Sequence, residues 1–436
     1  MCKFRVITFC IFMTVALIIA AALDNSGRTV HSESNNSDSF PSVHINTNLP
    51  ISRDFWNDAS VTLSNTDEHF MFFAERGRIR GRGNSSWDME KAPFRIRFNR
   101  PQTMLDSNHA AQDWTFIPNH SDKSLLRNYS AYFLASKLDG MDFAPFARFV
   151  DVYFNGEYQG VYMLCIQVEA GDGRAVLEYN SDPALSEYLI EMNHRINFEP
   201  DSVEGVTFVT VNERHYDILY PRSPHLHAGH VRYIRNFLTT VDDLIHAHDD
   251  SVFDFTDINS FVDFYIVQEL YKNLDVGYAS VFMQIKGSEN ERKLYMGPVW
   301  DFDISAGNAY FQGRHSEDDI YPYEYGYSPH GLWVAWTNRW FTNLMMMPEF
   351  FDAVTARWNE IVDYQIRETI EHIEFTALTY EEAFERNFER WHILGEEVWP
   401  NPQEVTEIDT FLGQVEYLVS WLEERIIGFT YFLNAE

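Results

Sequence analysis

Two acidic turns near the middle of the chain constrain its fold more than any other feature. The first turn holds Asp275, just after an apolar run at 258–272. The second holds Asp301 and Asp303, within Gly-Pro-Val-Trp-Asp-Phe-Asp at 297–303. The spacing of 26 residues from Asp275 to Asp301 allows a loop, two short strands and a turn, which would bring both turns to the mouth of one cleft.

Such a pair of carboxylates suits phosphoryl transfer. One carboxylate orients the substrate hydroxyl, and the other holds the Mg²⁺ that bridges the phosphates. Asp-x-Asp turns also occur as solvated loops and as calcium or glycosyltransferase metal sites. The motif alone therefore leaves these alternatives open.

The composition narrows the class of protein. A chain of 436 residues with 45% hydrophobic and 16% aromatic residues fills a substantial core, so it is not a disordered protein. The net charge of −32 repels phosphate backbones, which argues against nucleic acid as a partner. The same field attracts divalent cations and basic partners, and it predicts a basic, Ser-rich protein substrate.

The N-terminus has the pattern of an export signal. Lys3 and Arg5 precede an apolar stretch at 6–22 that ends in three alanines, which predicts a signal peptide cleaved after Ala22 or an uncleaved membrane anchor. Either form places the body outside the cytosol, secreted or at a cell surface or coat, with membrane contact only through that anchor. Residues 23–48 are rich in Ser and Asn and are expected to form a flexible linker. Cys165, in an apolar strand, is expected to be a buried, inert thiol.

The region at 49–169 reads as strands around a glycine loop. Gly-Arg-Gly-Asn-Ser-Ser at 81–86 joins two β-prone runs, so its backbone N–H groups, the hydroxyls of Ser85 and Ser86, and the charge of Arg82 suit phosphate oxygens. The loop matches neither a Walker A loop nor a dinucleotide fingerprint, and a plain hairpin turn stays an alternative. We expect a helix from Ser121 or Asp122 to Leu138, and then a hairpin turning at Asn155-Gly156. A hinge at 166–169 would follow.

The region at 170–436 is expected to be mostly helical with one β insertion. Residues 188–192 and 205–209 are strand-like, whereas apolar residues at helical spacing predict helices at 231–245, 258–272, 349–373 and 405–433.

Six motifs in this order resemble the spore coat protein H (CotH) family, whose active members are secreted or coat-associated kinases that transfer phosphate from ATP to serine. The resemblance extends over roughly residues 45–430, and the motifs lie at residues 80–87, 91–96, 122–128, 155–162, 273–275 and 297–308. The resemblance implies an α+β, bilobal protein-kinase-like fold. A β-rich small lobe with one main helix (49–169) would precede a mostly helical large lobe (170–436).

The resemblance also implies roles for individual residues. Asp275 falls at the catalytic base and Asp301 at the Mg²⁺ ligand, with Asp303 near the metal. Ser280 stands where many kinases place an asparagine ligand for a second metal, and serine is a poorer ligand. The expected cofactors are ATP and Mg²⁺, with Mn²⁺ as a substitute. The nucleotide would contact Arg82, Gly83, Ser85, Ser86, Arg95, Gln167 and Glu169.

The cation that steadies the phosphates has four candidates: Arg95, Arg97, Lys91 and Lys123. Arg95 is favoured because a fork of donors suits phosphate oxygens, although a structural surface arginine is a close alternative. Tyrosines alternate beyond the second acidic turn, at Tyr321, Tyr323, Tyr325 and Tyr327. They are expected either to contact the substrate or accept phosphate themselves, or to form an aromatic loop packed on the large lobe.

Three functions therefore compete. The leading one is an exported Ser/Thr protein kinase. The second is a noncatalytic surface or coat protein, such as an adhesin or assembly factor, that keeps the fold to bind a partner. The third is a nucleotide-sugar glycosyltransferase using Asp301 and Asp303, against which the β-first small lobe argues.

Overall fold

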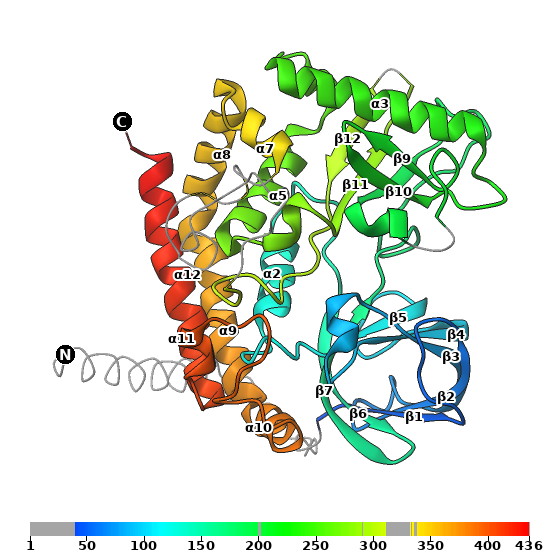
Figure 1. Cartoon of the computed structure of the whole chain (residues 1–436), viewed down its shortest axis with the longest axis vertical. Coiled ribbons are helices and arrows are strands. Elements are labelled where there is room, and N and C mark those ends of the chain that lie inside the picture. Colours follow the sequence, from blue (N-terminus) through cyan, green and yellow to red (C-terminus); the bar gives the residue numbers. More distant parts are fainter. Residues whose placement is uncertain are drawn as a thin grey trace, which may run out of the picture. The chain divides into compact units, whose positions relative to one another are not determined.

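The computed structural model describes residues 40–198, 202–289, 291–310, 332, 334 and 338–435, all within one unit, Phe40–Glu436. The fold is α+β, with a β-rich N-terminal region and most helices in the C-terminal part, as predicted (Figure 1). The predicted leader at 1–22 lies outside the described residues. Among the described residues, no helix is both long and apolar enough to cross a membrane.

A closed barrel forms the N-terminal region, with strands in the order β1-β2-β3-β4-β5-β7-β6. Alternate apolar residues, among them Ile79 and Ile96, point into it and form a separate core. The turn between β6 and β7 is the predicted Asn155-Gly156 turn. The strands are β1 (Ser42–Thr47), β2 (Asn57–Ser64), β3 (Phe72–Gly81), β4 (Phe94–Gln102), β5 (Ala111–Ile117), β6 (Ala147–Phe154) and β7 (Glu157–Ile166).

The first strand corrects the end of the predicted linker. Residues 23–48 were expected to be flexible, but β1 pairs with both β2 and β6 and closes the barrel. Val43 and Ile45 alternate with polar residues along β1 and are fully buried. The burial of these two side chains stabilises the strand, although the Ser/Asn-rich composition of 23–48 favoured a linker.

A second sheet has the order β12-β11-β8-β10-β9 and is covered on one side by α3 (Ala228–Ala247) (Figure 1). It contains the β insertion predicted near 188–209. The hairpin expected between the two acidic turns is also part of it. Its strands are β8 (Tyr188–Met192), β9 (Phe208–Val211), β10 (Arg214–Tyr220), β11 (Val281–Lys286) and β12 (Lys293–Met296).

The remaining helices, apart from α11, share one continuous core with this sheet and with the outer side of β6 and β7. They are α2 (Arg127–Ser136), α4 (Val252–Phe255), α5 (Ile258–Tyr271), α7 (Arg339–Leu344), α8 (Pro348–Ile361), α9 (Arg367–Thr379), α10 (Glu381–Arg390), α11 (Gln403–Thr406) and α12 (Phe411–Leu433). Short helical turns are η1 (Ser85–Asp88), η2 (His194–Phe198), η3 (Leu274–Gly277) and the π-helical η4 (Val362–Ile366).

Two helix boundaries differ from the prediction. The helix expected from Ser121 or Asp122 begins at Arg127, because Asp122 accepts hydrogen bonds from the backbone of Ser124 and Arg127 and holds a turn there. The helix expected at 405–433 is interrupted, and α12 begins only after Thr410, whose hydroxyl caps it. Cys165 is buried, as expected, and burial raises the pKa of its thiol.

Candidate active site

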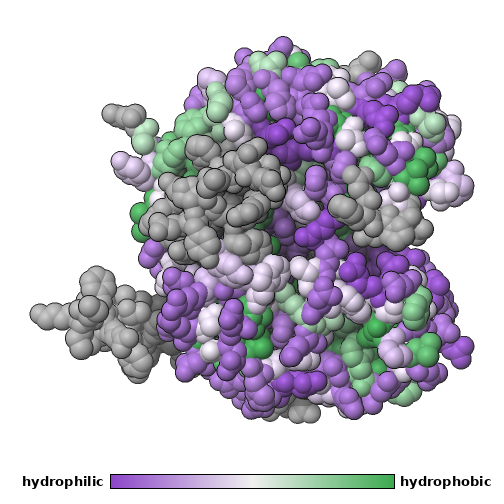
Figure 2. Space-filling view, in the orientation of Figure 1, coloured by the Kyte–Doolittle hydropathy of each residue, from purple (hydrophilic) through white to green (hydrophobic). Residues whose placement is uncertain are grey.

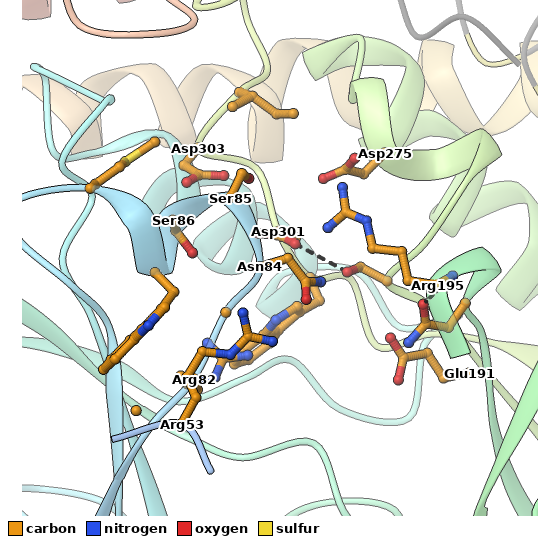
Figure 3. A pocket seen from close by; sticks show the side chains of 18 of the residues that line it. Arg53, Arg82, Asn84, Ser85, Ser86, Glu191, Arg195, Asp275, Asp301 and Asp303 are labelled. Carbon is orange, nitrogen blue, oxygen red and sulfur yellow. Dashed lines mark hydrogen bonds between the residues drawn. The ribbon is translucent and has the colours of Figure 1, made fainter. Parts of the chain in front are cut away.

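A cavity of about 1160 Å³ opens between the glycine loop of the barrel, the end of β8 and the two acidic turns (Figure 3). Segments from residue 51 to residue 304 line it, together with Trp399. Predicted site residues from distant parts of the sequence meet here: Arg82, Gly83, Ser85, Ser86, Gln167, Asp275, Ser280, Asp301 and Asp303.

The glycine loop is folded tightly against its neighbours. A Cβ on Gly81 would lie 2.1 Å from the ring of Trp87, and one on Gly83 would lie 2.4 Å from the Ser86 Oγ. Gly83 also has a φ of +84°, which glycine adopts without strain. In Figure 3 Ser85 and Ser86 lie beside the cavity, and no described residue forms a side-chain hydrogen bond with either hydroxyl. Both hydroxyls are therefore available to a ligand.

Asp275 lies in η3, just beyond the end of α5. Lys272 ends α5 in a left-handed conformation, and the side chain of Asn273 accepts a hydrogen bond of 3.1 Å from the Asp275 N–H. Burial, together with the nearby charge of Asp301, raises the pKa of Asp275 to about 7, and Arg195 opposes this shift. Figure 3 shows the Arg195 guanidinium reaching toward Asp275.

The second acidic turn is fixed on both sides. Asp301 has a φ of +69°, and its Oδ2 accepts a hydrogen bond of 3.1 Å from the Ser280 hydroxyl. The next N–H, of the buried Phe302, donates to the Asn128 side chain at 2.7 Å. Burial raises the pKa of Asp303 well above its usual range, and the charges of Asp301 and Asp275 add to the effect.

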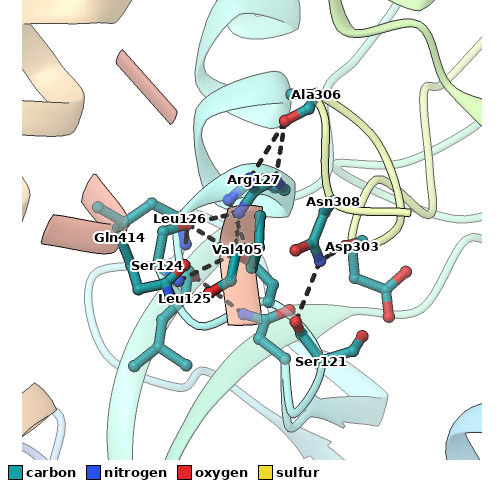
Figure 4. A network of polar contacts seen from close by, with 12 residues as sticks. Ser121, Ser124, Leu125, Leu126, Arg127, Asp303, Ala306, Asn308, Val405 and Gln414 are labelled. Carbon is teal, nitrogen blue, oxygen red and sulfur yellow. Dashed lines mark hydrogen bonds and ion pairs between the residues drawn. The ribbon is translucent and has the colours of Figure 1, made fainter. Parts of the chain in front are cut away.

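Buried polar contacts hold the chain that follows this turn (Figure 4). Arg127 forms an ion pair of 2.6 Å with Asp122, and its Nε donates to the Ser305 carbonyl at 3.0 Å. Asn308 donates to the carbonyls of Ser121 and Asp303. The segment at 121–128 thus holds the second acidic turn in place, in addition to leading into α2 at Arg127.

The donors suit a hard cation that arrives with a phosphate ligand. The carboxylates of Asp301 and Asp303 and the hydroxyl of Ser280 are oxygen donors, and Mg²⁺ typically takes one or two carboxylates and completes its shell with water and substrate phosphates. Within the described part of the chain, no group of three or more His, Cys, Asp or Glu residues is arranged to hold a metal ion alone.

Arg95, the favoured phosphate cation, does not line the cavity. Its guanidinium lies 5.0 Å from the ring centroid of Trp56 and within 3.7 Å of carboxylate oxygens of Asp113 and Glu169. Glu169 also lies outside the cavity and pairs with Arg174 at 3.3 Å. The hinge residue Gln167 does line it, with its Oε1 bonded to Thr115 at 2.7 Å.

The other three candidate cations are also engaged elsewhere. Lys91 is buried and donates to Asn387 and to the carbonyls of Pro118 and Val161. Lys123 donates to the Glu396 carbonyl at 2.6 Å, and Arg97 pairs with Asp113 at 2.9 Å. The cations that do line the cavity are Arg53, Arg80, Arg82 and Arg195.

Sequence reasoning missed Arg53, Arg195 and Glu191. Glu191 lies on β8, and burial with the charges of Asp217 and Asp301 raises its pKa to about 8. The sequence feature that could have identified Glu191 is its position as the one charged residue in the apolar run Tyr-Leu-Ile-Glu-Met at 188–192. Arg53 and Arg195 lie in connections without a recognisable motif. The tyrosines at 321–327 lie outside the described residues.

Comparison with protein families identifies a related family. The family model described as CotH kinase protein matches residues 79–426, which is most of the chain. No curated protein matches.

Proposed function

Since the chain belongs to the CotH kinase family, we propose that it is an exported protein kinase that transfers the γ-phosphate of ATP to Ser or Thr of a protein, with a bilobal, kinase-like arrangement of its parts. The observation that carries this proposal is the convergence of the glycine loop, Asp275 and Asp301 on one cavity. A phosphoryl transferase needs few covalent steps from the protein and depends on positioning and charge, which this cavity supplies.

Each group has a separate task. Asp275 accepts the proton of the acceptor hydroxyl while the oxygen of that hydroxyl forms a bond to the γ-phosphorus. The bond between the γ-phosphorus and the β–γ bridging oxygen breaks, and ADP leaves with the electron pair. Asp301 and Asp303 would hold Mg²⁺, which neutralises charge on the phosphates. The loop N–H groups with Ser85 and Ser86 would hold the phosphate oxygens.

Arg82 replaces Arg95 as the proposed phosphate cation. It lines the cavity, and its guanidinium lies 5.7 Å from the ring centroid of Trp300, next to Asp301 in sequence. Arg53 lies beside Arg82 in Figure 3. A pair of guanidinium forks opposite the metal-binding carboxylates would let one triphosphate bridge the basic and acidic sides.

The test is label transfer from γ-labelled ATP by the full chain with Mg²⁺ or Mn²⁺, to itself and to a Ser-rich basic peptide. Transfer should be lost in Asp301→Ala and in Asp275→Asn. It should persist in Asp352→Asn, a matched change at an exposed aspartate of α8. If the parent transfers no label and ATP with Mg²⁺ does not raise its Tm, the noncatalytic surface or coat function replaces this proposal.

A further inference from the structure

The outer face of β3 and β4 carries an arginine at successive outward positions. Along β3, Arg76, Arg78 and Arg80 alternate with buried Gly77, Ile79 and Gly81. Along β4, Arg95 and Arg97 alternate with buried Phe94, Ile96 and Phe98. We call these five side chains the arginine face. Residues 76–100 contain eight basic and two acidic residues, in a chain of net charge −32.

The pairing of the two strands places like charges opposite each other. Arg78 is the register partner of Arg97, and Arg80 is the partner of Arg95. Four guanidiniums lie 5.0–5.6 Å from the ring centroid of one indole, that of Trp56. Like charges directly across a ladder destabilise a sheet, so the arrangement costs stability that the fold itself does not require.

The neighbouring carboxylates neutralise only part of this charge. Asp113 pairs with Arg97 and Arg95, and Glu169 pairs with Arg95 and Arg174. Asp58 is the register partner of Arg78 on β2, but it forms no ion pair with Arg78. Among the described residues, no carboxylate forms an ion pair with Arg76, Arg78 or Arg80.

The arginine face is continuous with the cavity, because Arg80 belongs to both. A ligand that follows it would run from the cavity along the outside of the barrel, which suits an extended peptide rather than a compact nucleotide. Arginine forks bind carboxylates in a bidentate manner, and the half-buried Trp56 offers an apolar contact between them.

We propose that the arginine face with Trp56 is a docking surface for an acidic segment of the phosphate-accepting protein, next to the hydroxyl that is modified. This rests on the proposed function and reverses the basic substrate expected from the net charge. At physiological ionic strength charges are screened over about 8 Å, so a bound peptide responds to the arginines it touches and not to the distant acidic surface.

The test measures binding without ATP, by fluorescence anisotropy of a labelled peptide in which one serine is flanked by glutamates. A peptide with lysines in their place is the comparison. The full chain should bind the acidic peptide at least about tenfold more tightly than the basic one, and the preference should shrink with added salt. Equal or tighter binding of the basic peptide overturns the proposal.

Variants at exposed arginines locate the surface. Arg78→Glu should weaken binding of the acidic peptide by about tenfold or more, because it turns an attraction into a repulsion. Arg78→Lys should weaken this binding less, because the positive charge is kept. Arg232→Glu, a matched change on the exposed side of α3, should leave binding unchanged. An equal loss in Arg232→Glu, or displacement of the peptide by lower concentrations of single-stranded DNA than of unlabelled peptide, contradicts a peptide-docking role.

Binding by the Asp275→Asn variant separates this proposal from the catalytic one. It should equal that of the parent, since Asp275 has no part in the arginine face. A parent that binds the acidic peptide but transfers no phosphate would disprove the kinase activity alone. A parent that transfers phosphate without any preference for acidic peptides would disprove the docking surface alone.

Discussion

At the residue scale, Asp275 occupies a position that costs the metal-free protein stability. Burial, together with the charge of Asp301, raises the pKa of its carboxyl from 3.8 to about 7. A folded state that holds the proton more tightly than the unfolded chain loses stability as the pH rises from about 4 through 7. Above that range the full cost is present.

Asp275→Asn should therefore raise the Tm of the metal-free protein at pH 8 by roughly 2–5 °C, with little difference from the parent at pH 4. The measurement is calorimetry of both proteins across this pH range in chelator. Asp352→Asn, at an exposed position, should match the parent throughout. A Tm gain at pH 4 as large as that at pH 8 would mean that ionisation of Asp275 is not its origin.

Gly83 offers a second test at this scale, of the loop as a phosphate site. Gly83→Ala adds a Cβ at a φ of +84° and 2.4 Å from the Ser86 Oγ, so the loop must move. We expect ATP–Mg²⁺ to bind about tenfold more weakly in calorimetric titration, because the loop N–H groups lose their alignment.

Gly156→Ala is the control for backbone strain. Gly156 has a similar φ of +88°, but nothing lies within 4 Å of its added Cβ, and it belongs to the β6–β7 turn. This variant should lose some stability and keep its ATP affinity. If both variants bind ATP like the parent, the loop at Gly83 does not contact the phosphates.

Site residues that belong to short sequence motifs were easier to predict than those whose position depends on how distant strands pair. Asp275, Asp301 and Ser85 belong to short motifs, and all three line the cavity. Arg95, the favoured phosphate cation, does not line the cavity, whereas Arg80 does, and no local sequence pattern separates these two arginines. They are register partners on neighbouring strands.

At the scale of elements, periodicity predicted the pieces better than their ends. The strand at Tyr188–Met192 and the hairpin of β6 and β7 were predicted because alternation and Asn-Gly are local signals. The start of α2 and the strand β1 were not. The first depends on the buried Arg127–Asp122 pair, and the second on pairing with β6, about 100 residues away.

Deletion of β1 tests its place in the barrel. A chain beginning at Phe40 should fold like the full chain, whereas one beginning at Leu49 should lose several kcal/mol, about 1.5–3 for each of the buried Val43 and Ile45. The latter also exposes unpaired edges of β2 and β6, which favours aggregation. Urea unfolding and light scattering of the two chains measure both effects. Equal stability of the two chains would mean that residues 40–48 do not contribute to the folded barrel and belong to the flexible linker.

At the scale of the whole molecule, the barrel is joined to the C-terminal helices by buried polar contacts. Asn387 of α10 accepts hydrogen bonds from Lys91 at 2.8 Å and from the Val161 N–H at 3.1 Å. Gly160 lies against the same helix, since its Cβ would meet Asn387 at 2.5 Å. Burial lowers the pKa of Lys91 well below its usual value. No sequence motif predicts the contact between residues 91 and 387, which lie far apart in the sequence.

This contact should make the barrel and the helices unfold together. Asn387→Ala removes one of the three acceptors of the Lys91 Nζ and the side-chain acceptor of the Val161 N–H. We expect a loss of about 1–3 kcal/mol, because a buried donor is then desolvated without its bond. Asn359→Ala, at the exposed surface of α8, removes an amide with little effect. Calorimetry of the parent should show one transition, and that of Asn387→Ala an earlier transition for the barrel. One unshifted transition in Asn387→Ala would mean that the apolar contacts of α10 with β7 alone couple the two parts, and that the buried lysine is not what joins them.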